Sequence, residues 1–292
     1  MPERNSGAQV RPPRHYEVWQ VFYWIYDIAT PQLALLITAT FVGFFWLGCF
    51  LIRPILRTFV RGRSGTNDIV GYVLSCFGVF YGLLLGLIAV AAYQNLNRAE
   101  ENVAREAVAL TAVFQDLSTY PDPLRQSLRD ALRDYGAFVI ETAWPLQRQG
   151  TVPAEGTRKV LGFHEGLRTF EPQTLSQAVF HAETLRQFDA FYEARRIRVH
   201  DVHSGIPAVM WYVVIVGALL NLSIVWLFDM RLITQLFLGG MLAFFMGTMI
   251  FLIAAMDNPY KGEVSVSPAA FREAYDIMVA EERAAAPSQP SG

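Results

Sequence analysis

The chain has 292 residues, a formal net charge of −2 and a mean hydropathy of +0.27, and 53% of its residues are hydrophobic. A composition this apolar is unusual for a soluble domain and fits a chain that lies partly in lipid. The small net charge implies no general attraction to nucleic acid, so nucleic acid is not expected as a partner.

No cleavable signal peptide is expected in the N-terminal segment 1–32, because this segment lacks a compact apolar core with a small-residue cleavage site. We expect residues 1–14 to form a disordered tail. Aromatic residues then fall on one helical face, which is typical of a helix at the lipid–water interface. These residues are Tyr16, Trp19, Tyr23 and Tyr26.

Four segments are long enough to span a bilayer core of about 30 Å and contain no Asp, Glu, Lys or Arg. They cover residues 33–52, 69–93, 207–228 and 232–256. Ion-coupled carriers usually place ionisable groups at mid-depth, so the uncharged spans disfavour an active transporter. The sequence predicts an all-α polytopic membrane protein with four transmembrane helices, grouped as 33–93 and 207–256, and with the lipid bilayer as a partner.

The second span carries a row of small residues on one helical face, spaced three or four apart. The row consists of Gly71, Ser75, Gly78, Gly82 and Gly86. Such a face can let helices approach closely in the membrane. It can also line a conduit when several copies surround an axis. The sequence alone leaves both interpretations open.

The second span is predicted to continue into water as a stalk, because no Gly or Pro occurs between Leu87 and Tyr120. The polar sequence after Tyr93 follows a heptad pattern. One seam holds Leu96, Val103, Leu110 and Leu117, and the next holds Glu100, Ala107 and Phe114. We therefore expect one rod of about 50 residues, roughly 75 Å long.

The stalk opens a helical extramembrane insert, residues 94–206, between the second and third spans. Asp122 with Pro123 should cap and start a helix that ends near Trp144-Pro145. A short helix around His164 follows, and a long helix should begin at Glu171-Pro172. Two long insert helices can then pack as antiparallel neighbours. Segment 257–292 should form a turn, a short helix and a disordered tail.

No nucleophile elbow, phosphate loop or HExxH motif occurs, so the chain is not expected to be an enzyme. His200 and His203 have the spacing of a metal-binding pair, but no third or fourth ligand is evident. Arg195, Arg196 and Arg198 crowd the same turn. We expect this turn to be a solvated face at the interface, with no metal and no cofactor.

Short motifs spread over the chain resemble the bacterial family called bestrophin-like domain proteins, from the first span to Phe271. They are Arg105-Glu106-Ala107, Tyr135 with Glu141 and Trp144-Pro145, and the run 256–263 that leads to Ser267-Pro268. The family-motif residues of interest are Glu106, Tyr135, Glu141, Trp144, Pro145, Asp257, Pro259 and Gly262. Pro259 cannot continue a helix, so we expect Asp257 to accept N–H bonds from the turn that follows and to dock the C-terminal segment at the stalk base.

A similarity to bestrophins themselves implies a function. Leu85-Gly86-Leu87, Ala92-Tyr93 and Arg98 are similar to the end of the second helix in bacterial bestrophins. That resemblance implies a homo-oligomeric channel for small anions, since bestrophins are pentameric anion channels with this layout of spans and insert. The alternative is a non-conducting sensor or scaffold whose insert binds a partner or ligand. A channel would turn the small-residue face toward a shared axis, whereas a scaffold would bury it within one subunit.

The resemblance also implies a location in the bacterial inner (plasma) membrane, and four spans put both termini and the insert on one side. Arginines in the first hairpin favour a cytoplasmic hairpin by the positive-inside rule. They are Arg53, Arg57, Arg61 and Arg63. The larger total of basic residues on the opposite side favours the reverse, as does the bestrophin plan. We expect a cytoplasmic insert.

Overall fold

The computed structural model describes residues 26, 28–60 and 65–285, and every regular element in these ranges is helical. This confirms the all-α fold. The helices are α1 (Thr30–Leu51), α2 (Arg53–Val60), α3 (Thr66–Asp116), η3 (Leu117–Thr119), α4 (Leu124–Phe138), η4 (Val139–Ala143), α5 (Trp144–Arg148), α6 (Glu155–Arg168), α7 (Leu175–Asp201), α8 (Ala208–Val225), α9 (Leu232–Met256) and α10 (Ala269–Ala285). Apart from Tyr26, the aromatic helix expected before the first span lies outside the described residues, as do the tail 1–14 and residues 286–292 of the C-terminal tail.

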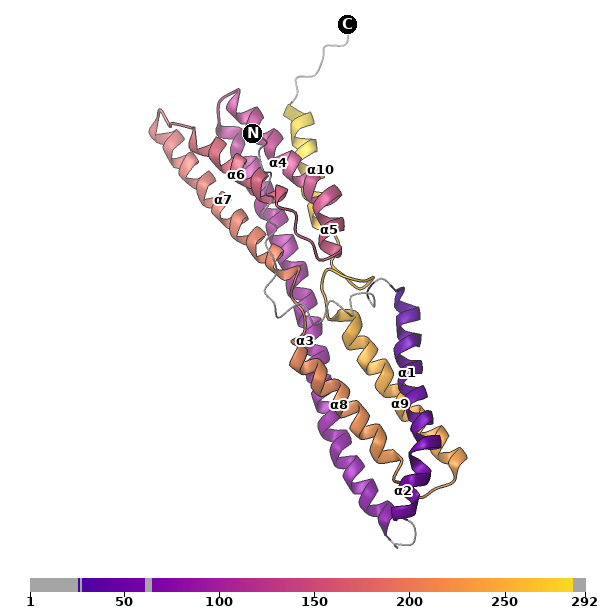
Figure 1. The fold of residues 1–292 in the computed structure, drawn as a ribbon. Helices are drawn as coiled ribbons and strands as arrows, with labels where there is room; N and C mark the ends of the chain where they lie inside the picture. The colour runs from indigo at the N-terminus through magenta and orange to yellow at the C-terminus, as the bar shows by residue number, and fades with distance from the viewer. Residues whose placement is uncertain (1–25, 27, 61–64, 286–292) are drawn as a thin grey trace, which may run out of the picture.

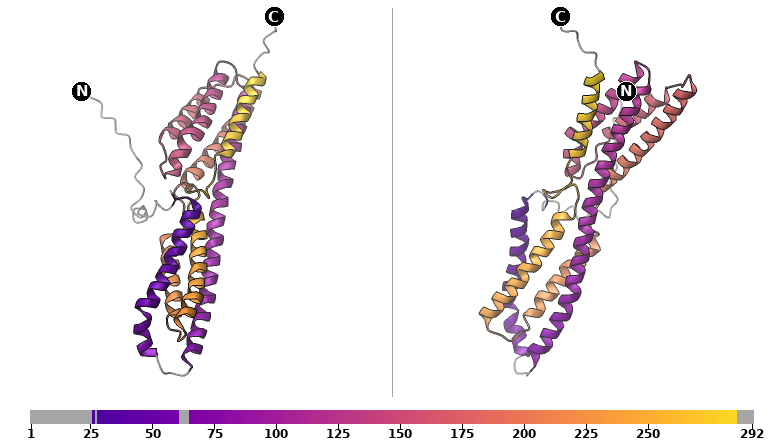
Figure 2. Two further views of the ribbon diagram at one scale, coloured as in Figure 1. Left: turned by 90° about the vertical axis from the view of Figure 1, so that its right-hand side faces the viewer. Right: turned by 180° about the vertical axis from the view of Figure 1, so that it is seen from behind.

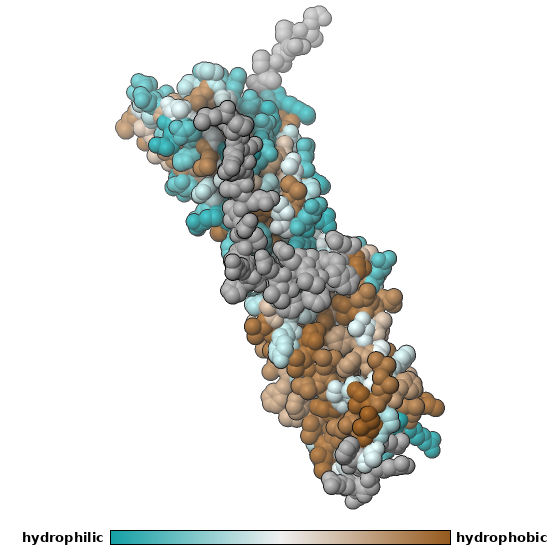
Figure 3. Space-filling view, in the orientation of Figure 1, coloured by the Kyte–Doolittle hydropathy of each residue, from teal (hydrophilic) through white to brown (hydrophobic). Residues whose placement is uncertain are grey.

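The molecule is elongated and has two halves (Figure 1; Figure 2). Four helices are long and apolar enough to cross a membrane: α1, the first part of α3, α8 and α9. On the face shown in Figure 3, the half that contains them is mostly apolar, whereas the insert half is mostly polar. An apolar surface of this extent requires lipid or further protein around it, so the four predicted spans are confirmed.

The two halves share α3, which runs without interruption for 51 residues from the membrane half to the far end of the insert. The predicted rod is therefore confirmed. Five heptad positions are buried: Val103, Ala107, Leu110, Phe114 and Leu117. Glu100 is exposed, contrary to the expected seam, and Ala99 is buried instead. A straight α-helix turns every 3.6 residues, so its buried face drifts away from a strict heptad.

The insert is a helical bundle around α3. The long helix α7 packs beside α3, α4 packs beside α6, and α10 packs against both α3 and α4. The apolar core between them includes Leu110, Phe114, Leu132, Phe191 and Phe271, each no more than 1% exposed. The C-terminal helix α10 thus completes the insert core well above the stalk base.

Two expected helix boundaries and one expected helix cap in the insert are wrong. Pro145 does not end the helix after α4, because a π-helical turn, η4, leads directly into α5 with Pro145 in its first turn. A wider turn lets the proline ring avoid the preceding carbonyls. Asp122 pairs with Arg125 instead of capping α4. Helix α7 begins only at Leu175, where the Thr174 hydroxyl accepts a hydrogen bond from the N–H of Gln177 at 3.2 Å.

Within the membrane half, glycines make room for aromatic side chains of neighbouring helices. A Cβ added to Gly239 would lie 1.9 Å from the Phe45 ring, and one added to Gly217 would lie 2.5 Å from the Tyr81 ring. Gly48 meets Trp226 in the same way, at 1.9 Å. These contacts hold α1 against α9 and α3 against α8. The glycines that pack the helices of the protomer are therefore different from the small-residue row on α3.

Candidate functional site

The small-residue face of α3 is open within the protomer. A Cβ added to Gly71, Gly78, Gly82 or Gly86 would meet no atom within 4 Å outside its own helix. The Ser75 hydroxyl donates to the Gly71 carbonyl at 2.8 Å, so it lies against its own helix. This face therefore takes no part in the packing that holds the protomer together.

Large apolar side chains lie beside the glycines on α3. Leu83 and Leu87 are each 63% exposed, and Tyr72 and Val79 are more exposed still. Only 17% of the apolar window of α3 is buried, against 39% for that of α9. Of the four spans, α3 is thus the one that the protomer covers least.

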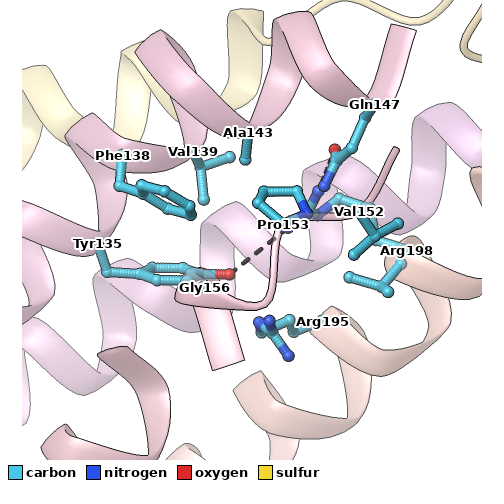
Figure 4. Close-up of a pocket in the computed structure, with 11 residues that line it drawn as sticks. Tyr135, Phe138, Val139, Ala143, Gln147, Val152, Pro153, Gly156, Arg195 and Arg198 are labelled. Carbon is cyan, nitrogen blue, oxygen red and sulfur yellow. Dashed lines mark hydrogen bonds between the residues drawn. The ribbon is translucent and has the colours of Figure 1, made fainter. Parts of the chain in front are cut away.

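A second constellation lies inside the insert, where Glu106 and Arg198 form a fully buried ion pair. Arg198 Nε donates to Glu106 Oε2 at 2.5 Å, and Arg198 Nη1 donates to Gln147 Oε1 at 2.7 Å. The Tyr135 hydroxyl donates to Glu106 Oε1 at 2.6 Å. One buried network therefore ties α3, α4, α5 and α7 together (Figure 4 shows three of its members).

The electrostatics of this network keep the Arg198 guanidinium charged. Burial alone would lower the pKa of Arg198, but Glu106 raises it well above its usual value. Burial raises the pKa of the Tyr135 hydroxyl, and the Glu106 carboxylate raises it further, so this hydroxyl stays protonated and donates. A charge-neutral network whose polar groups are paired has no free nucleophile or base. Its chemistry is that of a structural clamp.

The family motif after α9 forms a second clamp, at the membrane end of the insert. Asp257 accepts from the Ile206 N–H at 2.6 Å, from Trp211 Nε1 at 3.1 Å and from the Tyr26 hydroxyl at 3.1 Å. Burial raises the pKa of Asp257, while these three donors oppose the rise. The expectation that Asp257 serves the turn that follows is wrong, because Asn258 Oδ1 accepts the Tyr260 N–H there.

The remaining motif residues divide between core and surface. Trp144 is buried with its ring 5.6 Å from that of Tyr260, which joins the clamp after α9 to the insert core. Pro259 is buried, and Gly262 has a φ of +78°, which explains a glycine there. Glu141 and Pro145 are exposed and take no part in either clamp.

The arginine-rich turn of α7 is not the solvated face that the sequence suggested. Arg195 and Arg198 are buried, and only Arg196 is exposed. His200 and His203 are exposed, and no group of three His, Cys, Asp or Glu side chains within the described ranges could hold a metal. The sequence did not identify Arg198 and Gln147 as partners of Glu106. A signal for Arg198 was available, because Phe188, Phe191, Arg195 and Arg198 recur every three or four residues and therefore share one helical face.

These observations define an integral membrane protein with four spans. Its long helix α3 runs from the membrane half into a helical insert, which a buried ion pair holds together. A family model described as the bestrophin-like domain matches residues 39–271. Because this match covers most of the chain, the protein belongs to the bestrophin-like family. No curated protein matches the chain.

Solved structures show the same fold. A crystal structure of a bacterial bestrophin homologue from Klebsiella pneumoniae matches with a TM-score of 0.58 and 13% identity, over 85% of this chain and 96% of the homologue. A point variant of a bacterial bestrophin homologue from the same organism matches with a TM-score of 0.57 and 12% identity, over 85% and 97% of the two chains. At these identities the likeness is one of fold.

Replacing Asp257 with alanine should lower the melting temperature of the purified protein. The change leaves three donors without their acceptor, which should cost about 2 kcal/mol or more. Thermal unfolding in detergent measures the effect, and Asp276→Ala on the exposed side of α10 is the matched control. A normal melting temperature combined with lost activity would assign Asp257 a functional role and contradict the structural one.

Proposed function

We propose that the protein forms a homo-oligomeric anion channel in the bacterial inner membrane, with the small-residue face of α3 toward the shared axis. The observation that carries the proposal is the open space beside Gly71, Gly78, Gly82 and Gly86. A scaffold that buried this face within one subunit would place side chains there. Within the protomer, aromatic side chains pack against other glycines, namely Gly48, Gly217 and Gly239, and this row is left free.

The composition of the spans supports anions over cations as the permeant class. Cation channels commonly use rings of Asp or Glu in the conduit. None of the four apolar segments has an acidic residue, so a conduit along α3 would present glycines and apolar side chains. The exposed Leu83 and Leu87 would form apolar rings in such an assembly, and apolar constrictions can gate by dewetting.

Oligomerisation is part of the proposal because the glycine row can enclose a conduit only when several copies meet. The low coverage of α3 within the protomer leaves surface for neighbouring copies. In the same proposal the insert is cytoplasmic, as the bestrophin layout implies. The N-terminal end of α1, the insert and α10 lie toward the same end of the spans (Figure 1), which fits both termini on that side.

The test measures oligomer mass and chloride efflux from liposomes for the same variants. Gly82→Leu should leave the oligomer intact and reduce efflux at least tenfold, because a large side chain enters the conduit. Gly43→Leu is the matched control, since Gly43 on α1 also has no atom within 4 Å of an added Cβ. It should change neither quantity.

Two outcomes would redirect the interpretation. If Gly82→Leu dissociates the oligomer, the row is a close-packing interface between subunits. If correctly assembled wild-type protein passes no halide above the level of empty liposomes across several pH and calcium conditions, the channel proposal fails. The non-conducting sensor or scaffold would then take its place.

A further inference from the structure

A small cavity lies inside the insert, beside the clamp that Glu106 and Arg198 form. Its volume is about 10 Å³. It is lined by α4, η4, α5, residues 152–153, the first turn of α6, and α7. The lining includes Tyr135, Phe138, Gln147, Pro153, Arg195 and Arg198. The two arginines reach it from α7, on the side opposite the apolar wall that α4 and η4 supply (Figure 4).

Arg195 has much less hydrogen bonding than its burial demands. The residue is 7% exposed, and Nη2 donates to the Thr157 hydroxyl at 3.1 Å. Its Nε is fully buried without a hydrogen-bond partner, and no carboxylate among the described residues forms an ion pair with it. Arg195 is therefore a buried cation with a donor to spare at the wall of a cavity.

The neighbouring charges do not compensate Arg195. Arg198 and Glu106 form a one-to-one pair, so together they contribute no net charge. Taking an unpaired cation out of water costs several kcal/mol, and proteins normally offset this with a counter-charge. The cavity wall therefore carries one cationic side chain that forms no ion pair with a described carboxylate.

Gly156 lets the Arg195 guanidinium and the Phe138 ring pack closely against the first turn of α6. A Cβ at this position would lie 3.2 Å from Arg195 Nη2 and 3.1 Å from the Phe138 ring. Any side chain there would press on the guanidinium. Gly156 and Arg195 both line the cavity, so a larger residue at position 156 would displace the guanidinium from its wall.

We propose that this cavity binds one halide-sized inorganic anion, with Arg195 as its counter-charge and the Nε–H as a donor. The volume is about that needed for a single water molecule, so a monatomic anion suits it better than phosphate or a carboxylate metabolite. A bound halide would give Arg195 its missing partner and tie α7 to the segment that carries Gly156. The site lies in the insert, apart from the small-residue face of α3, and does not depend on whether that face conducts.

The first test compares thermal unfolding of the full-length protein in detergent, in chloride and in gluconate at one ionic strength. Gluconate is too large for the cavity, so the wild-type protein should melt several degrees higher in chloride. Arg195→Gln should abolish this chloride-dependent gain. Arg196→Gln, which changes an exposed arginine on the same turn, should keep it and also controls for halide bound elsewhere.

The second test covers the case in which Arg195→Gln fails to fold. Wild-type crystals grown in bromide should show an anomalous peak within hydrogen-bond distance of Arg195 Nε, and Gly156→Ala should weaken this peak. Occupation of the cavity by water alone in bromide would overturn the proposal. An unchanged chloride-dependent gain in Arg195→Gln would overturn it as well.

Discussion

Replacing Glu106 with alanine should destabilise the insert by about 3–5 kcal/mol, because it leaves the buried Arg198 without its counter-charge. Glu106 is 0% exposed and Arg198 is 1% exposed, so water cannot substitute for the missing carboxylate. The change also removes the acceptor of the Tyr135 hydroxyl. Thermal unfolding in detergent should show this as the largest loss among alanine variants of the insert's charged residues.

Matched variants separate this effect from loss of charge in general. Glu101 is exposed on the same helix, so Glu101→Ala should change stability by no more than about 0.5 kcal/mol. Combining Glu106→Leu with Arg198→Met removes both charges and should recover much of the loss, since a buried pair can often be replaced by apolar residues. A double variant as unstable as Glu106→Ala would show that the ion pair is not the cause.

The main features of the fold could be predicted from sequence because they depend on local periodicity. Uncharged runs of spanning length predicted the four membrane helices, and the lack of Gly and Pro after Leu87 predicted the continuous α3. The continuation of the helix through Pro145 and the role of Asp122 could not be predicted, because each depends on neighbouring turns. A π-helical turn accommodates Pro145, and Asp122 pairs with Arg125.

The clamps could be predicted only in part. The resemblance singled out Glu106, Tyr135 and Asp257, but nothing local indicates that Glu106 meets Arg198, 92 positions further along the chain. An arginine beside histidines is typical of a solvated interface, and only the packing of α7 on α3 shows that Arg198 is buried. The partners of Asp257 are equally remote, since Ile206 precedes it by 51 positions.

The glycines show why the candidate conduit could be located but not interpreted from sequence. Gly82 on α3 and Gly239 on α9 both lie inside apolar helices, so their sequence contexts are similar. In the structure Gly239 receives the Phe45 ring, whereas Gly82 meets nothing within 4 Å. A glycine that the protomer itself uses and one that it leaves open differ only in the surrounding helices.

Breaking α3 between the membrane and the insert should have an equally large effect, and Asn97→Pro makes this break. Proline removes a backbone hydrogen bond and its ring clashes with the preceding turn, which costs about 3 kcal/mol or more in a helix interior. Because α3 runs through both halves, the kink should also misalign the insert with the spans. We expect a lower melting temperature and new protease sensitivity near residue 97.

The matched control for this change is Leu175→Pro, at the first position of α7. Leu175 is 83% exposed and follows Thr174 in an extended conformation, so proline fits there without loss of an internal bond. Gly150 is unsuitable although it lies in a turn, because its φ of +78° is closed to proline. Equal tolerance of proline at Asn97 and Leu175 would contradict a continuous α3. Sensitivity at Asn97 alone would support α3 as the rod through which the insert and the spans are held in one geometry.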